Sequence, residues 1–147
     1  MSALIYPAFE YKVKKIENKP YIFDIIRKKY IQITPEEWVR QHIIHWLINQ
    51  IGYPKALIKI ETGLIYNKRL KRTDIEVYDR EGRPFLVVEC KAVTILKAED
   101  ALMQALVYNT ALNAPFLMIS NGNTHYFLKK YEMSFEFIDT LPTFNQT

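Results

Sequence analysis

The sequence predicts an α/β (α+β) domain: a mixed β-sheet of about five strands flanked by helices, in the order α-β-β-β-α-β-β, with an N-terminal extension. Two segments with helical spacing of apolar residues alternate with shorter segments rich in β-branched residues, which is typical of a sheet covered by helices. The 147 residues suffice for one domain, and no segment between these elements resembles a linker. We therefore expect one domain over residues 1–147, in which residues 1–33 are an extension that packs on the core.

The composition excludes several classes of protein. Hydrophobic residues make up 49% and charged residues 24% of the chain, so we expect a globular protein and not a disordered one. The 1 cysteine has no partner for an internal disulfide, which favours a cytoplasmic location. The chain has no apolar run long enough to cross a membrane and does not begin like a secretory signal, so no membrane partner is expected. The net charge of +4 permits a polyanionic partner without requiring one.

The first helix is predicted between Thr34 and Gly52. Thr34 suits the N-cap, Pro35 suits the first helical position, and Glu37 suits the third, as in a capping box. Gly52 suits the C-terminal end. A second helix is predicted over residues 96–113. Its apolar side is marked by Leu102, Ala105, Leu106 and Leu112.

The strands are predicted by alternating or continuous apolar runs that turn residues bound. A two-residue turn at Glu81 and Gly82 would join two of these strands into a hairpin. One or two lead-in strands are expected before the first helix. The strands expected in the sheet are residues 56–67 with a bend near Gly63, 70–79, 84–92, 115–120 and 124–130.

The hairpin over residues 70–92 places charged side chains where a buried strand is expected. Side chains alternate along a strand, so Glu89 and Lys91 share the face opposite the apolar one. Continuing the pairing from the turn places Asp74 across from Glu89, with Cβ atoms roughly 5 Å apart. Two carboxylates at that distance repel, so Lys91, a nearby arginine or a divalent cation must offset them. The apolar face carries Leu86, Val88, Cys90 and Ala92, and the other face carries Phe85 and Val87 besides the two charged residues.

Two other interpretations compete with a metal site here. Exposed strands often carry Glu and Lys as a solvated pair, and a bulge in the hairpin would turn Asp74 to the wrong face. The apolar opposite face, Asp74 on the neighbouring strand and a basic segment just upstream together favour the metal site, because carboxylate oxygens suit Mg²⁺ or Mn²⁺. Basic residues near the site would bind backbone phosphates. The candidates are Lys68, Arg69, Lys71 and Arg72, with Arg27, Lys28 and Lys29 further away.

The ordered set of motifs resembles the PD-(D/E)xK nuclease superfamily, whose members share a restriction-endonuclease-like core. More closely, the chain resembles the small proteins related to the N-terminal nuclease domain of type I restriction enzyme R subunits. The resemblance runs from Ile22 to Phe127. It implies hydrolysis of nucleic acid in restriction or DNA repair, and DNA is the expected substrate. It also implies association into a homo-oligomer or a larger restriction or repair complex. The segments that carry the resemblance are "IFDIIRKKYIQITPEEWVRQ", "KRTDIEVYD", "VVECKA", "QALVYN" and "ISNG".

The resemblance also implies roles for individual residues. Asp74 and Glu89, joined by the backbone carbonyl of Cys90, would ligate Mg²⁺ or Mn²⁺, as one ion or two. Lys91 would orient or activate the attacking water and stabilise charge on the phosphate.

Three helical residues are implied in the same way. Glu37 matches a first-helix glutamate that lies near the metal in many members, although a helix cap would use the same carboxylate. Gln104 and Tyr108 match the Q-x-x-x-Y motif of the second helix, which lies near the site and the nucleic-acid backbone.

Two departures from the pattern limit what is expected. Thr73 stands where many members have proline, and no nucleotide-binding G-x-x-x-x-G-K-[ST] motif is present, so no ATP-driven motor is expected in this chain. The alternative function is a non-catalytic module that keeps the nuclease fold and binds nucleic acid or forms a complex.

Overall fold

The structure is a computed structural model of the chain. The residues that it describes are 4–60, 63–66, 69–72, 74–92, 102–103, 105–106, 109–110, 112–132 and 134–144, with only the backbone described for 63–66 and 69–72. Within these residues the fold is mixed α+β, as predicted.

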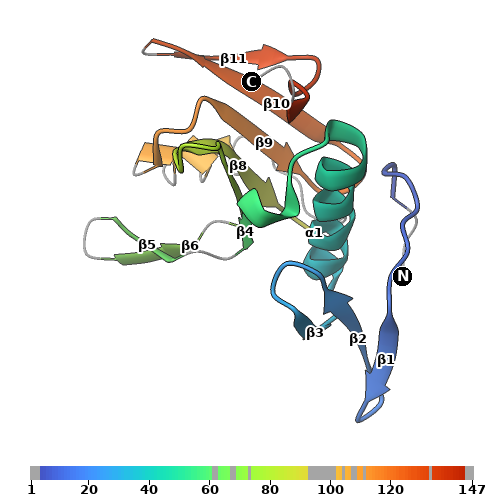
Figure 1. The fold of residues 1–147 in the computed structure, drawn as a ribbon. Coiled ribbons are helices and arrows are strands. Elements are labelled where there is room, and N and C mark those ends of the chain that lie inside the picture. Colours follow the sequence, from blue (N-terminus) through green and yellow to red (C-terminus); the bar gives the residue numbers. More distant parts are fainter. Residues whose placement is uncertain are drawn as a thin grey trace.

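A six-stranded sheet, in the order β11-β10-β9-β8-β7-β4, forms the centre of the fold (Figure 1). Neighbouring strands are antiparallel except β8 and β9, which are parallel, so the sheet is mixed as predicted. A parallel pair needs a crossover connection, and the described residues between 102 and 112 are helical. The six strands are β4 (Ile58–Ile60), β7 (Ile75–Tyr78), β8 (Pro84–Cys90), β9 (Phe116–Ser120), β10 (His125–Tyr131) and β11 (Ser134–Ile138).

The sheet has one strand more than the sequence predicted. The edge strand β11 pairs only with β10, and most of its residues are exposed. Its position is fixed by hydrogen bonding to β10 across a turn in which Glu132 has a positive φ of 51°.

The first helix begins and ends where the sequence predicted. The helix α1 (Pro35–Trp46) has Thr34 as its N-cap, and the Thr34 hydroxyl accepts a hydrogen bond from the backbone N–H of Glu37 at 3.1 Å. One π-helical turn, η1 (Leu47–Ile51), continues it, and Gly52 ends it with a φ of +86°. A short 3-10 helix, η2 (Lys55–Leu57), then leads into β4.

The hairpin of β7 and β8 has the predicted pairing but a different turn. Ile75 lies opposite Val88 and Val77 opposite Leu86, as the sequence predicted. The two-residue turn is wrong, because Tyr78 pairs with Pro84 around a longer loop and the register shifts beside Val77. The bulge leaves Phe85 as the extra residue, so Phe85 packs on the same cluster as Leu86 and not with Val87 as predicted.

The two long strands predicted over residues 56–67 and 70–79 are each divided in the structure. Their outer parts, β5 (Gly63–Tyr66) and β6 (Arg69–Arg72), pair with each other and not with the central sheet. Ile60 pairs with Ile75 and Gly63 with Arg72, so the register is the same in both parts. The β5–β6 ribbon extends away from the sheet in Figure 1.

The N-terminal residues form a separate three-stranded antiparallel sheet, where one or two strands were predicted. Its strands are β1 (Val13–Ile16), β2 (Lys19–Asp24) and β3 (Lys29–Gln32). It lies beside the N-terminal end of α1 (Figure 1), and its Ile22 side chain is fully buried.

Apolar side chains cover both faces of the central sheet. One cluster joins the sheet to α1, and a second contains Val87, Leu117 and Ala105 from the other face. The apolar side predicted for the second helix lies in or against this second cluster. Both faces of β8 are therefore buried, so a charged side chain on this strand has little contact with water. Among the described residues, no helix is long and apolar enough to cross a membrane.

We predict that Leu86→Ala and Leu117→Ala each lower the free energy of unfolding by about 2–5 kcal/mol, because they remove fully buried side chains from opposite faces of the sheet. Denaturant unfolding measures both changes. Phe137→Ala is the control, since that side chain is 67% exposed and should matter little. If Leu117→Ala left the free energy of unfolding unchanged, only one face of the sheet would be packed.

Candidate functional site

Three of the predicted site residues meet where β8 ends and β7 begins. Asp74 immediately precedes β7, and its Oδ2 accepts a hydrogen bond from the backbone N–H of Cys90 at 2.6 Å. The Lys91 Nζ lies 2.9 Å from Glu89 Oε1. The pairing of Ile75 with Val88, continued by one residue, places Asp74 opposite Glu89. The structure therefore brings Asp74, Glu89 and Lys91 together, and we call these three residues the acid cluster. Their roles stay predictions.

The end of β8 is held by its parallel neighbour. Glu89 pairs with Ile119, and the backbone N–H of Lys91 donates to the carbonyl of Ser120 at 2.9 Å. Glu89 is 3% exposed, whereas the Lys91 side chain is 22% exposed. The lysine can thus reach solvent at the sheet's end while the glutamate stays inside. Cys90, between them, is fully buried in the cluster under α1, as expected of a small core residue.

Burial and the neighbouring acid change the protonation of Glu89. Burial first, and then the charge of Asp74, raise the pKa of Glu89 above its ordinary value, although Lys91 opposes the shift. Partial burial lowers the pKa of Lys91, but the hydrogen bond and charge of Glu89 outweigh it and raise the pKa overall. The repulsion that the sequence predicted for two facing carboxylates is present, and the lysine stays protonated at neutral pH.

An arginine from α1 supplies further positive charge to the acids. Arg40 Nη2 lies 2.9 Å from Asp74 Oδ1, and Arg40 Nη1 lies 2.7 Å from Glu37 Oε1. The Arg40 side chain is only 5% exposed. The sequence left open whether an arginine, the lysine or a cation offsets the acids, and it did not identify Arg40. The signal was its spacing, three residues after Glu37 on one helix face.

The two glutamates of the first helical turn lie in different surroundings. Glu37, which the resemblance placed near the metal, accepts hydrogen bonds from Arg27, Arg40 and Gln41 at 2.7–3.0 Å. Glu36, which the sequence reasoning missed, is the one affected by Asp74: burial and then the charge of Asp74 raise the pKa of Glu36. Glu36 is also 45% exposed, so it borders the acid cluster from the solvent side.

A buried aspartate connects this network to the N-terminal sheet. Asp24, at the end of β2, is fully buried, and it accepts hydrogen bonds from Gln41 Nε2 at 2.8 Å and from Arg27 Nε at 2.9 Å. Burial raises the pKa of Asp24, but hydrogen bonds from the Arg27 backbone and the Gln41 amide outweigh it and lower the pKa overall. Arg27, predicted among distant phosphate-binding candidates, is therefore part of an internal ion-pair chain. The chain runs from Asp24 through Arg27, Glu37 and Arg40 to Asp74.

Several predicted site residues cannot be placed with this cluster. Gln104, Tyr108 and Lys68 lie outside the described residues. The three other basic candidates belong to β6, for which the backbone alone is described: Arg69, Lys71 and Arg72.

The acid pair suits a hard cation in one respect. Glu89 Oε2 is buried and has no hydrogen-bond partner among the described residues, so it has a free acceptor position. Both Asp74 oxygens already accept a hydrogen bond. No group of three or more His, Cys, Asp or Glu side chains suited to a metal is found in the described part of the chain, and the predicted set needs only two carboxylates and a backbone carbonyl.

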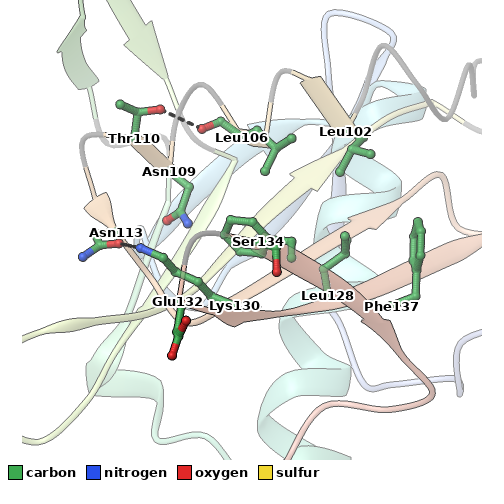
Figure 2. Close-up of a pocket in the computed structure, with 11 residues that line it drawn as sticks. Leu102, Leu106, Asn109, Thr110, Asn113, Leu128, Lys130, Glu132, Ser134 and Phe137 are labelled. Carbon is green, nitrogen blue, oxygen red and sulfur yellow. Dashed lines mark hydrogen bonds between the residues drawn. The ribbon is translucent and has the colours of Figure 1, made fainter.

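A separate hollow of about 640 Å³ lies on the second face of the sheet (Figure 2). Leu102, Leu106 and Leu128 form part of its wall, and Lys130 and Asn113 are hydrogen-bonded at its rim. None of Asp74, Glu89 and Lys91 is among its lining residues. The acid cluster and this hollow are therefore different places in the molecule.

The comparisons with known proteins agree with the resemblance. Residues 35–142 match the family model described as type I restriction enzyme R protein N terminus. No curated protein matches the sequence. The matched residues include α1 and the whole acid cluster, and they begin after the N-terminal three-stranded sheet.

We predict that Asp24→Ala lowers the free energy of unfolding by about 3–5 kcal/mol, because it removes the buried carboxylate to which Arg27 Nε and Gln41 Nε2 donate and leaves the partly buried Arg27 charge short of one partner. Chemical denaturation measures the change. Arg83→Ala is the control: its ion pair with Asp79 is exposed, and losing it should have little effect. Equal effects of the two substitutions would contradict the network's role.

A second prediction concerns pH. The pKa of Asp24 is lower in the folded protein than in the unfolded chain, where it is about 3.9. Its stabilising contribution is thus complete above that unfolded value and is lost as the pH falls through the lower folded value. We expect the stability advantage of the wild type over Asp24→Asn to be constant at neutral pH and to shrink in acid. An advantage that persists undiminished in strong acid would contradict the lowered pKa.

Proposed function

Because the chain belongs to the family of type I restriction enzyme R protein N termini, we propose that it is a metal-dependent nuclease that hydrolyses phosphodiester bonds in DNA. The observation that carries the proposal is the convergence of Asp74, Glu89 and Lys91 from adjoining β-segments. Restriction or DNA repair, in a homo-oligomer or a larger complex, is the setting that the family suggests.

The arrangement of elements supports a restriction-endonuclease-like core. After α1 come the antiparallel strands β4, β7 and β8, then helical residues, and then β9 parallel to β8. Asp74 and Glu89 lie on the two central antiparallel segments, where this kind of core holds its acids.

Asp74 and Glu89, with the carbonyl of Cys90, are proposed to hold Mg²⁺ or Mn²⁺. Such a cation, when bound, supplies an activated water and neutralises charge on the phosphate. The free acceptor position on Glu89 Oε2 supports this assignment. The raised pKa of Glu89 also supports it, since an acid held beside another acid gains most from a neighbouring positive charge.

Lys91 is proposed to act as a donor and not as a base. The hydrogen bond and charge of Glu89 raise the pKa of Lys91, which favours the charged ammonium as a donor. From its place at the sheet's end it can orient the attacking water and stabilise the negative charge that develops on the phosphate. Glu89 positions the lysine through the 2.9 Å ion pair.

A second candidate function is a non-catalytic module that binds nucleic acid or forms a complex. The ion pair between Arg40 and Asp74 favours it, because this pair already neutralises one of the two acids without a cation. The two candidates differ in whether the cluster supports turnover, which cleavage assays decide.

We predict that Lys91→Ala lowers the rate of DNA cleavage by about 10²–10³-fold, the cost typical of losing one preorganised donor to the transition state. The assay follows cleavage of plasmid and single-stranded DNA with Mg²⁺ or Mn²⁺. Lys55→Ala, which removes an exposed lysine from η2, is the matched control. If Lys91→Ala cleaves as fast as the control while circular dichroism shows it folded, the proposed mechanism is wrong.

We predict that cleavage requires a divalent cation and stops in excess chelator, because the proposal assigns activation of water to the cation that the two carboxylates hold. Adding Mg²⁺ or Mn²⁺ should restore the wild type but not Glu89→Gln, which keeps the shape of the side chain and loses its charge. Cleavage that continues at an unchanged rate in chelator would exclude the cation. Wild-type protein that binds DNA but never cleaves it with either cation would favour the non-catalytic module.

A further inference from the structure

The N-terminal sheet has one face directed inward and one directed outward. Ile22 and Asp24 of β2 are fully buried, so the alternate residues Tyr21 and Phe23 belong to the outer face. Cross-strand pairing extends this face to both neighbouring strands: Lys14 pairs with Tyr21, and Phe23 pairs with Tyr30. We call this surface the basic-aromatic face. It comprises Lys12, Lys14, Ile16, Lys19, Tyr21, Phe23, Tyr30 and Gln32.

Aromatic rings lie at the centre of the basic-aromatic face. Phe23 and Tyr30 are direct cross-strand neighbours, with ring centroids 5.4 Å apart in an edge-to-face arrangement. Tyr21 adjoins them, and all three side chains are partly exposed. The three rings thus leave part of their flat surface accessible to a ligand at the centre of this face.

Lysines surround these rings. Lys12, Lys14 and Lys19 are all exposed, and Lys14 Nζ lies 4.0 Å from the centre of the Tyr30 ring. None of the positions on the basic-aromatic face is acidic. Glu17 lies in the turn between β1 and β2, and Asp24 is buried on the other face and paired with Arg27. The surface therefore combines exposed positive charge with flat aromatic rings.

We propose that the basic-aromatic face binds single-stranded nucleic acid, with the lysines on the phosphates and the rings against unstacked bases. Positive charge alone would suit any polyanion, but stacking on rings requires bases that are not paired in a duplex. The surface lies before residues 35–142, so it is not part of the matched family segment. The choice of nucleic acid over another polyanion rests on the proposed nuclease function.

The ion-pair chain gives this surface a physical connection to the acid cluster. Asp24 ends β2, the strand that carries Tyr21 and Phe23, and Arg27 joins Asp24 to Glu37. Arg40 then links Glu37 to Asp74. A strand bound on the basic-aromatic face is thus held by an element that is tied to the site through paired charges.

The test measures binding of the full chain to a fluorescently labelled single-stranded DNA oligonucleotide by anisotropy. Chelator is present throughout, so that binding is separated from cleavage. The triple variant Lys12→Gln, Lys14→Gln, Lys19→Gln should weaken binding at least about tenfold and reduce the slope of log affinity against log salt by about 2, which is three phosphate contacts at roughly 0.7 each. The control triple variant Lys15→Gln, Lys55→Gln, Lys59→Gln removes the same charge from exposed positions outside this face and should bind nearly as the wild type does.

The aromatic part has its own variants. Tyr21→Ala should weaken binding to the single strand at least about fivefold, whereas Tyr21→Phe keeps the ring and should bind normally. A duplex of the same length should bind more weakly than the single strand and respond less to Tyr21→Ala. Circular dichroism and thermal unfolding check that each variant is folded. If Tyr21→Ala does not fold, the lysine variants still test the inference.

Two results would overturn the inference. Equal losses in the two lysine triple variants would show that only net charge matters. The second result has two parts. The protein binds the duplex, or vesicles of anionic lipid, more tightly than the single strand, and Tyr21→Ala, Tyr21→Phe and the wild type all bind equally. This result would show that the surface binds another polyanion. The two tests are separate: Lys91→Ala is measured by cleavage with Mg²⁺ or Mn²⁺, whereas the Tyr21 and lysine variants are measured by binding in chelator. The proposed function can therefore fail while the binding differences remain.

Discussion

The buried guanidinium of Arg40 is the interaction on which the arrangement of this protein depends. It joins Glu37 on its own helix to Asp74, which immediately precedes β7, so it fixes α1 against the end of the strands that carry the acids. Buried charges are costly unless each is paired and hydrogen-bonded, and removing one partner exposes the full cost for the other. The same requirement extends through Arg27 to Asp24, so the N-terminal sheet is held by the same charge network as the site.

The sheet supplies the second constraint, because both of its faces are covered. Apolar residues from α1 pack on one side of β8 and those of the helical segment on the other. Glu89 then has water-poor surroundings, which raise its pKa, and it gains from any positive charge nearby. In this protein the partly exposed Lys91 supplies positive charge to Glu89, and Arg40 supplies it to Asp74. A cation would join a site in which Lys91 and Arg40 already pair with the two acids, so the acids, the lysine and the arginine must be considered as one electrostatic unit.

The proposed function and the basic-aromatic face place two different demands on the chain. The acid cluster lies in the segment that matches the family of type I restriction enzyme R protein N termini, and its geometry follows from the packing of the core. The basic-aromatic face lies before that segment and depends on a small sheet with little core of its own. Its orientation relative to the site is fixed by Ile22 and the pairing of Asp24, which is why an extension of this size can present a defined surface.

The sequence by itself determined the elements whose signals are local. Thr34, Pro35 and Gly52 set the limits of α1, and the alternation around Glu89 fixed which side chains of β8 share a face. The tertiary structure alone decided what depends on distant contacts. The edge strand β11 exists through pairing with β10. The bulge at Phe85 lies beside a loop longer than the predicted turn, and Ile75 still lies opposite Val88 as predicted. Arg40 reaches Asp74 only because α1 packs on the sheet. Hydrogen bonds and ion pairs between residues 34 positions apart leave no periodic trace in a sequence, which is why the contact of Arg40 with Asp74 was not predicted.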